Sequence, residues 1–142
     1  MKRGFSTQLF KTISDFQQFK LLEEIRYGAA DGTQYLIPLY ASSDLASTPQ
    51  AVWGALLFLV PNGWYAVSAF LHDSAFQNTL LVEDENGVRR LANLTEAQAN
   101  DLLLEAMHWQ KPMPTDFERL QMDAVYEGVT IGGWHAFKED RN

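Results

Sequence analysis

The first 40 residues contain short apolar-rich runs that predict β-strands. An Asp-Gly pair at residues 31–32 is typical of a hairpin turn, because glycine adopts the positive φ that tight turns need. Pro38 cannot donate a ladder hydrogen bond, so its strand should lie at a sheet edge or end there. The expected strands are residues 5–10, 19–27 and 34–40, of which the second is also compatible with a helix.

Helical spacing of apolar residues prevails after residue 40. Thr48, followed by Pro49, is expected to cap a helix that runs to about Leu59. Thr95 and Gln98 have the spacing of a capping box. Further helices are expected over residues 64–76, from Thr95 to about Trp109, and after Thr115, with a short acidic-tipped hairpin at residues 80–91.

The apolar positions indicate which helix faces are buried. One face of the helix at residues 64–76 should carry Trp64, Val67, Leu71 and Ala75, and the stripe of the last helix should be Phe117, Leu120, Ala124 and Val125. These patterns predict an α+β fold with a small N-terminal antiparallel sheet packed with about four helices. We expect a single domain over residues 1–142, with a β-rich part at 1–40 and a mainly helical part at 41–137.

Composition and charge exclude several classes of partner and of chemical site. The chain has 142 residues, a formal net charge of −7 and no cysteine. The acidic balance argues against nucleic acid as a partner, because neutralising phosphates needs clustered cations. The missing thiols exclude disulfides, thiolate metal sites and cysteine nucleophiles. The most apolar run, residues 51–60, is too short to cross a membrane, which needs a helix of about 20 residues.

Three residues are candidates for chemistry: Asp44, His72 and Asp73. Asp44 lies in a serine-rich loop before the helix expected after Thr48, where a carboxylate can bind a metal, act as a base or simply cap the loop. His72 is a proton-transfer group near neutral pH, and a neighbouring carboxylate can orient its ring. The alternative for this pair is a buried, hydrogen-bonded histidine with no chemical role. Adjacent helical residues point about 100° apart, so His72 and Asp73 do not readily chelate one ion.

The other motifs are less informative. His108 and His135 form no H-x-x-x-H or H-E-x-x-H pattern with the third histidine, so a zinc site of the usual helical kind is not expected. No glycine-rich phosphate loop and no G-x-S-x-G elbow is present in the sequence. No cofactor is therefore expected, and a divalent metal held by distant carboxylates and histidine stays an alternative.

Several of these motifs together resemble a small uncharacterised family of tailed phages and prophages. They are Ile37-Pro38, Ser43-Asp44-Leu45-Ala46-Ser47-Thr48-Pro49 and Leu71-His72-Asp73. On a later helix, family members carry an arginine and an aspartate where this chain has Glu96 and Asn100. The resemblance implies a phage or prophage origin and a mixed α+β fold, and these two departures count against catalysis.

Two functions follow as alternatives. The first is a binding or structural component of a phage particle, its tail or its assembly, with a protein partner or self-association that uses some of the four tryptophans. The second is a small hydrolase, with or without a divalent metal, that acts on a cell-wall bond or a nucleotide. In it, Asp44 and His72 would activate water and Asp73 would orient the histidine. Either protein would be made in the cytoplasm of the bacterial host, and the first could enter the phage particle.

Overall fold

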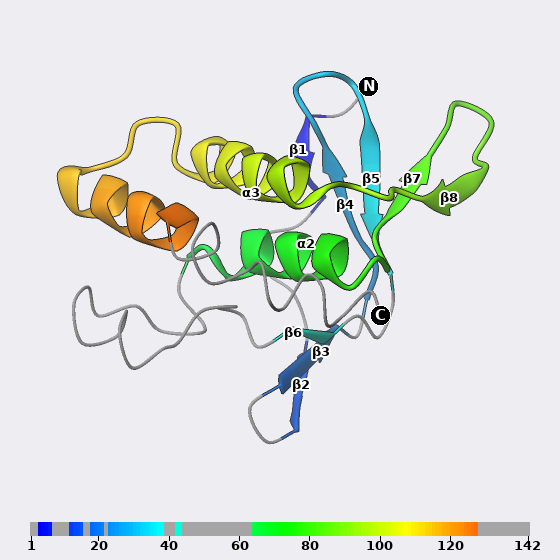
Figure 1. The fold of residues 1–142 in the computed structure, drawn as a ribbon, viewed down its shortest axis with the longest axis horizontal. Helices are drawn as coiled ribbons and strands as arrows, with labels where there is room; N and C mark the ends of the chain where they lie inside the picture. Colours follow the sequence, from blue (N-terminus) through cyan, green and yellow to red (C-terminus); the bar gives the residue numbers. More distant parts are fainter. Residues whose placement is uncertain are drawn as a thin grey trace.

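The computed structural model describes residues 3–6, 12–15, 18–21, 23–38, 42–43 and 64–127. In this part of the chain, two helices lie beside a five-stranded sheet, and a third helix lies at the end of the molecule away from that sheet (Figure 1). The helices are α2 (Ala66–Phe76), α3 (Glu96–Gln110) and an unlabelled helix at residues 116–127, drawn in orange.

The five-stranded sheet is antiparallel throughout and has the order β1-β4-β5-β7-β8. Its strands are β1 (Gly4–Phe5), β4 (Ile25–Gly28), β5 (Gln34–Ile37), β7 (Leu81–Glu83) and β8 (Arg89–Leu91). A second antiparallel sheet has the order β2-β3-β6 and consists of β2 (Thr12–Asp15), β3 (Gln18–Leu21) and β6 (Ser42–Ser43).

The α+β class expected from the sequence is confirmed, but the sheet is not confined to the N-terminus. The hairpin expected at residues 80–91 forms, and β7 pairs with β5, so residues from the expected helical part complete the sheet. The single strand expected at residues 19–27 is wrong, because β3 and β4 join different sheets. Which sheet a strand joins depends on tertiary pairing, and a local apolar pattern does not encode that pairing.

The Asp-Gly turn forms as expected and connects β4 to β5. Gly32 has φ +95°, and the Ala29 amide donates to the Thr33 carbonyl oxygen at 2.9 Å. The Asp31 carboxylate accepts from the Thr33 amide, which lowers the pKa of Asp31. β5 ends at Ile37, just before Pro38, and lies inside the sheet between β4 and β7. Residues 7–10, where a strand was expected, and the helix expected after Thr48 lie outside the described residues.

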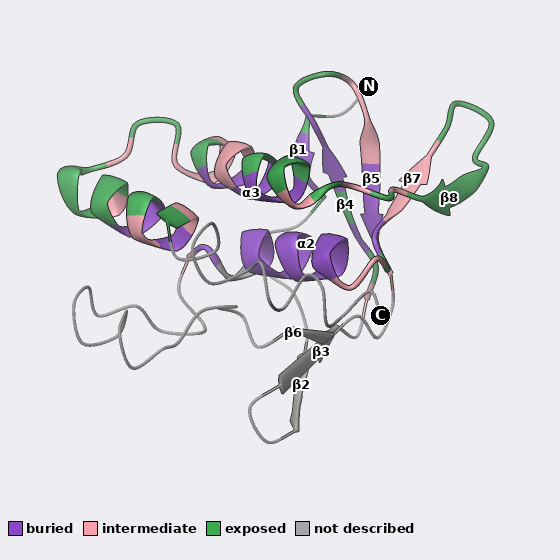
Figure 2. Cartoon of the chain, viewed as in Figure 1, coloured by how far each residue is buried: buried purple, intermediate pink, exposed green. Residues whose placement is uncertain are grey.

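Helix α2 is the centre of the core. Every residue from 67 to 76 is buried, so the expected face with Val67, Leu71 and Ala75 lies in the core, and so does the rest of the helix (Figure 2). The physical reason is that α2 packs against α3 and β5 and also against β6, which leaves it no solvent side. The main core joins this helix to α3 and to the sheet through Phe5, Ile25, Tyr27, Ile37, Phe70, Leu71, Phe76, Leu80, Ala99 and Ala106.

Capping boxes begin the two helices that follow the β7–β8 hairpin. The Thr95 hydroxyl accepts from the Gln98 amide at 3.1 Å, and the Gln98 side chain accepts from the Thr95 amide at 2.9 Å, as the sequence predicts. Thr115 and Glu118 make the same pair of bonds at the start of residues 116–127. The Thr115 amide and the nearby Lys111 ammonium both lower the pKa of Glu118.

Thr95→Ala should reduce the free energy of unfolding by about 1 kcal/mol, because it leaves an amide of the first turn of α3 without its acceptor. Thr95→Ser keeps the hydroxyl and should unfold within a few tenths of a kcal/mol of the wild type. Urea unfolding of the three proteins tests this. Equal midpoints for the alanine and serine variants would show that the cap contributes nothing.

Glu105 ties α3 to the sheet. Its carboxylate accepts from the Tyr27 hydroxyl at 2.5 Å and from the Ala30 amide at 3.2 Å. Arg3, before β1, donates to the same Tyr27 oxygen at 3.1 Å and to the Gly28 carbonyl oxygen at 3.0 Å. Burial, followed by the hydrogen bond to Glu105, raises the pKa of Tyr27.

This shift predicts a loss of stability in alkaline solution. The Tyr27 pKa is higher in the folded than in the unfolded chain, so its contribution is complete below the unfolded pKa of about 10 and declines as the pH rises above it. Tyr27→Phe should remove a large part of this decline, although it also loses the hydrogen bond at neutral pH. The measurement is urea unfolding of both proteins from neutral to strongly alkaline pH. Parallel pH profiles for the two proteins would contradict the assignment.

Candidate functional site

The polar cluster defined by His72, Asp73 and Asn100 lies in the interface between α2 and α3. The Nε2 atom of His72 is 2.8 Å from the Oδ1 atom of Asn100. All three residues are buried, with exposed fractions of 1%, 6% and 4% in that order. Such burial requires that the polar atoms be hydrogen-bonded, because water is not there to satisfy them.

The contact with Asn100 sets the orientation of the His72 ring. An amide oxygen carries no hydrogen, so Nε2 is the donor and Asn100 Oδ1 the acceptor. The other ring nitrogen, Nδ1, then lies on the side of Asp73, whose Oδ1 atom is 3.6 Å away. The His72 ring also packs on Phe76, with ring centroids 4.1 Å apart. The imidazole is therefore positioned by Asn100 of α3 and by Asp73 and Phe76 of α2.

A second polar link joins the same two helices about one turn away along α2. The buried Ser68 hydroxyl donates to Gln110 Oε1 at 2.5 Å, and Gln110 Nε2 donates to the Trp64 carbonyl oxygen at 2.9 Å. Since the start of α2 meets the end of α3 while His72 meets Asn100 near the start of α3, the helices run antiparallel. The polar links thus fix both the register and the separation of α2 and α3.

Asp44 itself lies outside the described residues, so its contacts with the polar cluster stay a prediction. The strand that immediately precedes it, β6, packs against α2. The described backbone before Asp44 therefore lies against the helix that carries His72.

The remaining candidate residues fall in different places. His108 is exposed near the end of α3, where a cation suits the helix dipole. Trp64 is half-buried, and its Nε1 atom donates to Gln121 Oε1 at 3.0 Å, while Trp109 packs edge-on against Phe5. His135, Trp53 and Trp134 lie outside the described residues.

An open pocket of about 320 Å³ lies between α3 and the β4–β5 turn, away from the polar cluster. Its polar lining comes from Asp31, Gln98, Asp101 and Glu105, and its walls include Tyr35 and Leu102. Glu105 is already bonded to Tyr27, and Asp101 accepts from the Tyr126 hydroxyl at 3.1 Å. Within the described residues, no group of three or more histidines and carboxylates is arranged to hold a metal ion.

Comparison with known protein families assigns the chain to one of them. A family model described as "Protein of unknown function (DUF1353)" matches residues 19–122. The chain belongs to the DUF1353 family. The DUF1353 match runs from β3 into the helix of residues 116–127, so it includes the polar cluster and leaves β1 outside. Membership of a family of unknown function is thus confirmed, while its link to phages stays a prediction.

Other comparisons add no relative: no curated protein and no solved structure matches the chain. Among the described residues, no helix has the length and apolar character needed to cross a bilayer.

The main residue that the sequence did not identify as part of the site is Asn100. The resemblance marked this position as a departure from aspartate, and the structure places it against the His72 ring. The Asn100 oxygen accepts from a histidine N–H as a carboxylate oxygen can, but it carries no charge.

Proposed function

We propose that this DUF1353 chain is a binding or structural component of a phage particle, its tail or its assembly, encoded by a phage or prophage. One contrast carries the proposal. His72 and Asp73, which could act as an acid or a base, are buried between two helices. In contrast, large apolar side chains are exposed on the helix of residues 116–127 and on the loop before it. Among them, Met113 is 92% exposed, Leu120 54% and Phe117 49%.

The polar cluster has a structural role in this proposal. Burying a polar group is unfavourable unless it is paired, and a paired group fixes one arrangement of its neighbours. The His72–Asn100 and Ser68–Gln110 contacts thus hold α3 on α2. The small core that supports residues 116–127 contains Tyr65, just before α2, Leu103 and Met107 of α3, and Met122 and Val125. The pair of helices α2 and α3 therefore positions the helix of residues 116–127.

The sequence predicts one apolar stripe along the helix of residues 116–127. Val125 is buried as the sequence indicates, but Phe117 and Leu120 of the same expected stripe face outward. Exposed large apolar residues that are adjacent in space mark interaction sites more often than isolated ones do. This supports a binding role for the helix of residues 116–127.

Density-gradient fractionation tests the function. After prophage induction in the bacterium that encodes the chain, the wild type should sediment with particles or assembly intermediates. Phe117→Asp with Leu120→Asp should stay in the light fractions, and Val88→Asp, an equally exposed site on the β7–β8 hairpin, should behave like the wild type. A wild type confined to the light fractions in every preparation would contradict the proposal.

A hydrolase is the second candidate, and the orientation of His72 favours it. Because Nε2 is bonded to Asn100, the proton-accepting nitrogen is Nδ1, on the side of Asp73. Asn100 of α3 thus orients the base, and Asp73, the next residue of α2, places a carboxylate beside it. We propose for this candidate that Asp44 and His72 activate water, with or without a divalent metal, that Asp73 orients the histidine, and that the substrate is a cell-wall bond or a nucleotide.

Hydrolysis assays distinguish this candidate from the first. Purified protein is incubated with cell-wall fragments and with nucleotides, with and without divalent metals. The hydrolase predicts turnover that His72→Gln abolishes and that Asn100→Asp, which restores a carboxylate beside the ring, increases. Turnover that His72→Gln leaves unchanged would come from another site or a contaminant.

A further inference from the structure

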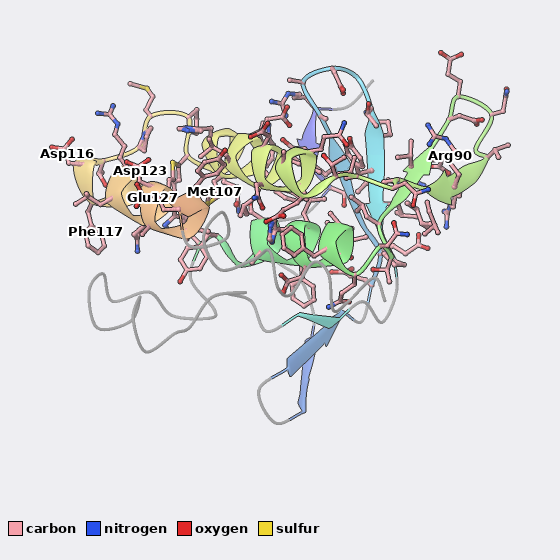
Figure 3. All side chains as sticks on the ribbon, viewed as in Figure 1. Arg90, Met107, Asp116, Phe117, Asp123 and Glu127 are labelled. Atoms are coloured by element: carbon pink, nitrogen blue, oxygen red, sulfur yellow. The ribbon has the colours of Figure 1, made fainter. Side chains whose placement is uncertain are left out.

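The exposed side of residues 113–127, which we call the outer face, has an apolar and an acidic part. Phe117 and Leu120 are three residues apart, which places them on one side of the helix. Asp116, Asp123 and Glu127 run beside them, because Asp116 and Leu120, and Asp123 and Glu127, are four residues apart. Figure 3 shows these labelled carboxylates and Phe117 at the end of the molecule opposite the β7–β8 hairpin.

The acidic part carries uncompensated charge. Arg119 lies 3.8 Å from Asp116 at the surface, and Lys111 pairs with Glu118 at 3.0 Å. Within the part of the chain that the structure describes, neither Asp123 nor Glu127 has a cationic group within ion-pair distance. Like charges four residues apart on a helix repel each other, so this pair slightly destabilises its own helix. Cations supplied by a partner would remove that repulsion.

These features favour one kind of partner, and the inference rests on the binding function proposed above. We propose that the outer face binds a cationic amphipathic segment of another protein, whose apolar side chains cover Phe117 and Leu120 and whose lysines or arginines meet Asp123 and Glu127. Apolar contact at the centre would supply affinity, and the flanking charges would select the partner and speed association.

Charge also argues against a second copy as the occupant. The chain has a formal net charge of −7, and pairing the outer face with itself would bring two acidic rows together. Such like-charge contacts oppose association.

Isothermal titration calorimetry with three helical peptides of equal length tests the inference. One peptide is cationic and amphipathic, one has the same composition in scrambled order, and one replaces its lysines by glutamates. The full-length chain should bind the first peptide at least about tenfold more tightly than the others, and raising the salt from about 0.05 to about 0.3 M should weaken binding. Phe117→Asp, and separately Asp123→Lys with Glu127→Lys, should each weaken it by about tenfold, while Val88→Asp should not.

Several results would overturn the inference. These are the absence of binding to all three peptides, equal binding of the anionic peptide, and binding that the outer-face variants do not change. Concentration-dependent dimerisation abolished by Phe117→Asp would identify a second copy as the occupant instead. Gradient fractionation separates this inference from the proposed function. If Asp123→Lys with Glu127→Lys still sediments with particles while Phe117→Asp does not, the binding function stands and the cationic partner is wrong.

Discussion

His72→Ala is expected to reduce the free energy of unfolding by about 3 kcal/mol. The substitution leaves Asn100 Oδ1 without its donor in a buried interface, and a buried polar group that loses its partner costs about 1–3 kcal/mol. It also removes the ring that packs on Phe76 and leaves a cavity, which adds a further cost. Urea unfolding followed by circular dichroism measures the change.

His108→Ala is the matched control for this prediction. His108 is exposed on α3, so its loss should change stability by no more than about 0.5 kcal/mol. Asn100→Ala removes the same contact from the other helix and should cost about 2 kcal/mol. If His72→Ala and His108→Ala unfolded at the same urea concentration, the polar cluster would not hold the helices together.

Gly4→Ala is expected to be destabilising to a similar extent, about 3 kcal/mol. Gly4 has φ +85°, which costs an L-residue with a side chain about 1–2 kcal/mol. A Cβ atom at this position would also lie 1.9 Å from Trp109 Cε2, so β1 or the indole would have to move. Overpacking of this kind costs about 1–3 kcal/mol, and here it would disturb the edge-on contact of Trp109 with Phe5.

Gly87→Ala separates the cost of backbone strain from the cost of the steric clash with Trp109. Gly87 has a similar φ of +78°, but a Cβ atom there would meet only Glu83 Oε1, at 3.9 Å. Its substitution should cost the backbone strain alone, about 1 kcal/mol. Thermal and urea unfolding of the two variants should therefore differ by about 2 kcal/mol. Equal losses would mean that Trp109 does not pack closely on β1.

Local signals in the sequence predict the local structure well. The capping box at Thr95, the Asp-Gly turn at residues 31–32 and the end of β5 before Pro38 depend on neighbours within a few residues. Which strands form each of the two sheets depends on contacts between distant segments. Nothing in the run at residues 19–27 indicates that its two halves pair with different strands, nor that β7 would pair with β5.

The polar cluster was partly predictable. The sequence identifies His72 and Asp73 as candidates from their chemistry, and the resemblance draws attention to position 100. The hydrogen bond between His72 and Asn100 joins residues 28 apart in the chain, and it follows from the antiparallel packing of α2 and α3. Helical spacing likewise could not predict that Phe117 and Leu120 face outward, because an apolar stripe is the same in sequence whether it packs on the protein's own core or on a partner.

The structural role of the polar cluster is tested most directly by thermal unfolding in the presence of Mg²⁺, Mn²⁺, Ca²⁺ and Zn²⁺. Wild type is compared with a variant that combines Asp44→Ala and His72→Ala, and chelator-treated protein serves as the reference. A metal that binds only the folded chain raises its stability by about 2.7 kcal/mol at a concentration one hundred times its dissociation constant. We predict the same melting temperature for the wild type with every metal, and a much lower one for the variant. A metal that raises the melting temperature of the wild type and leaves that of the variant unchanged would contradict the structural role and favour the hydrolase.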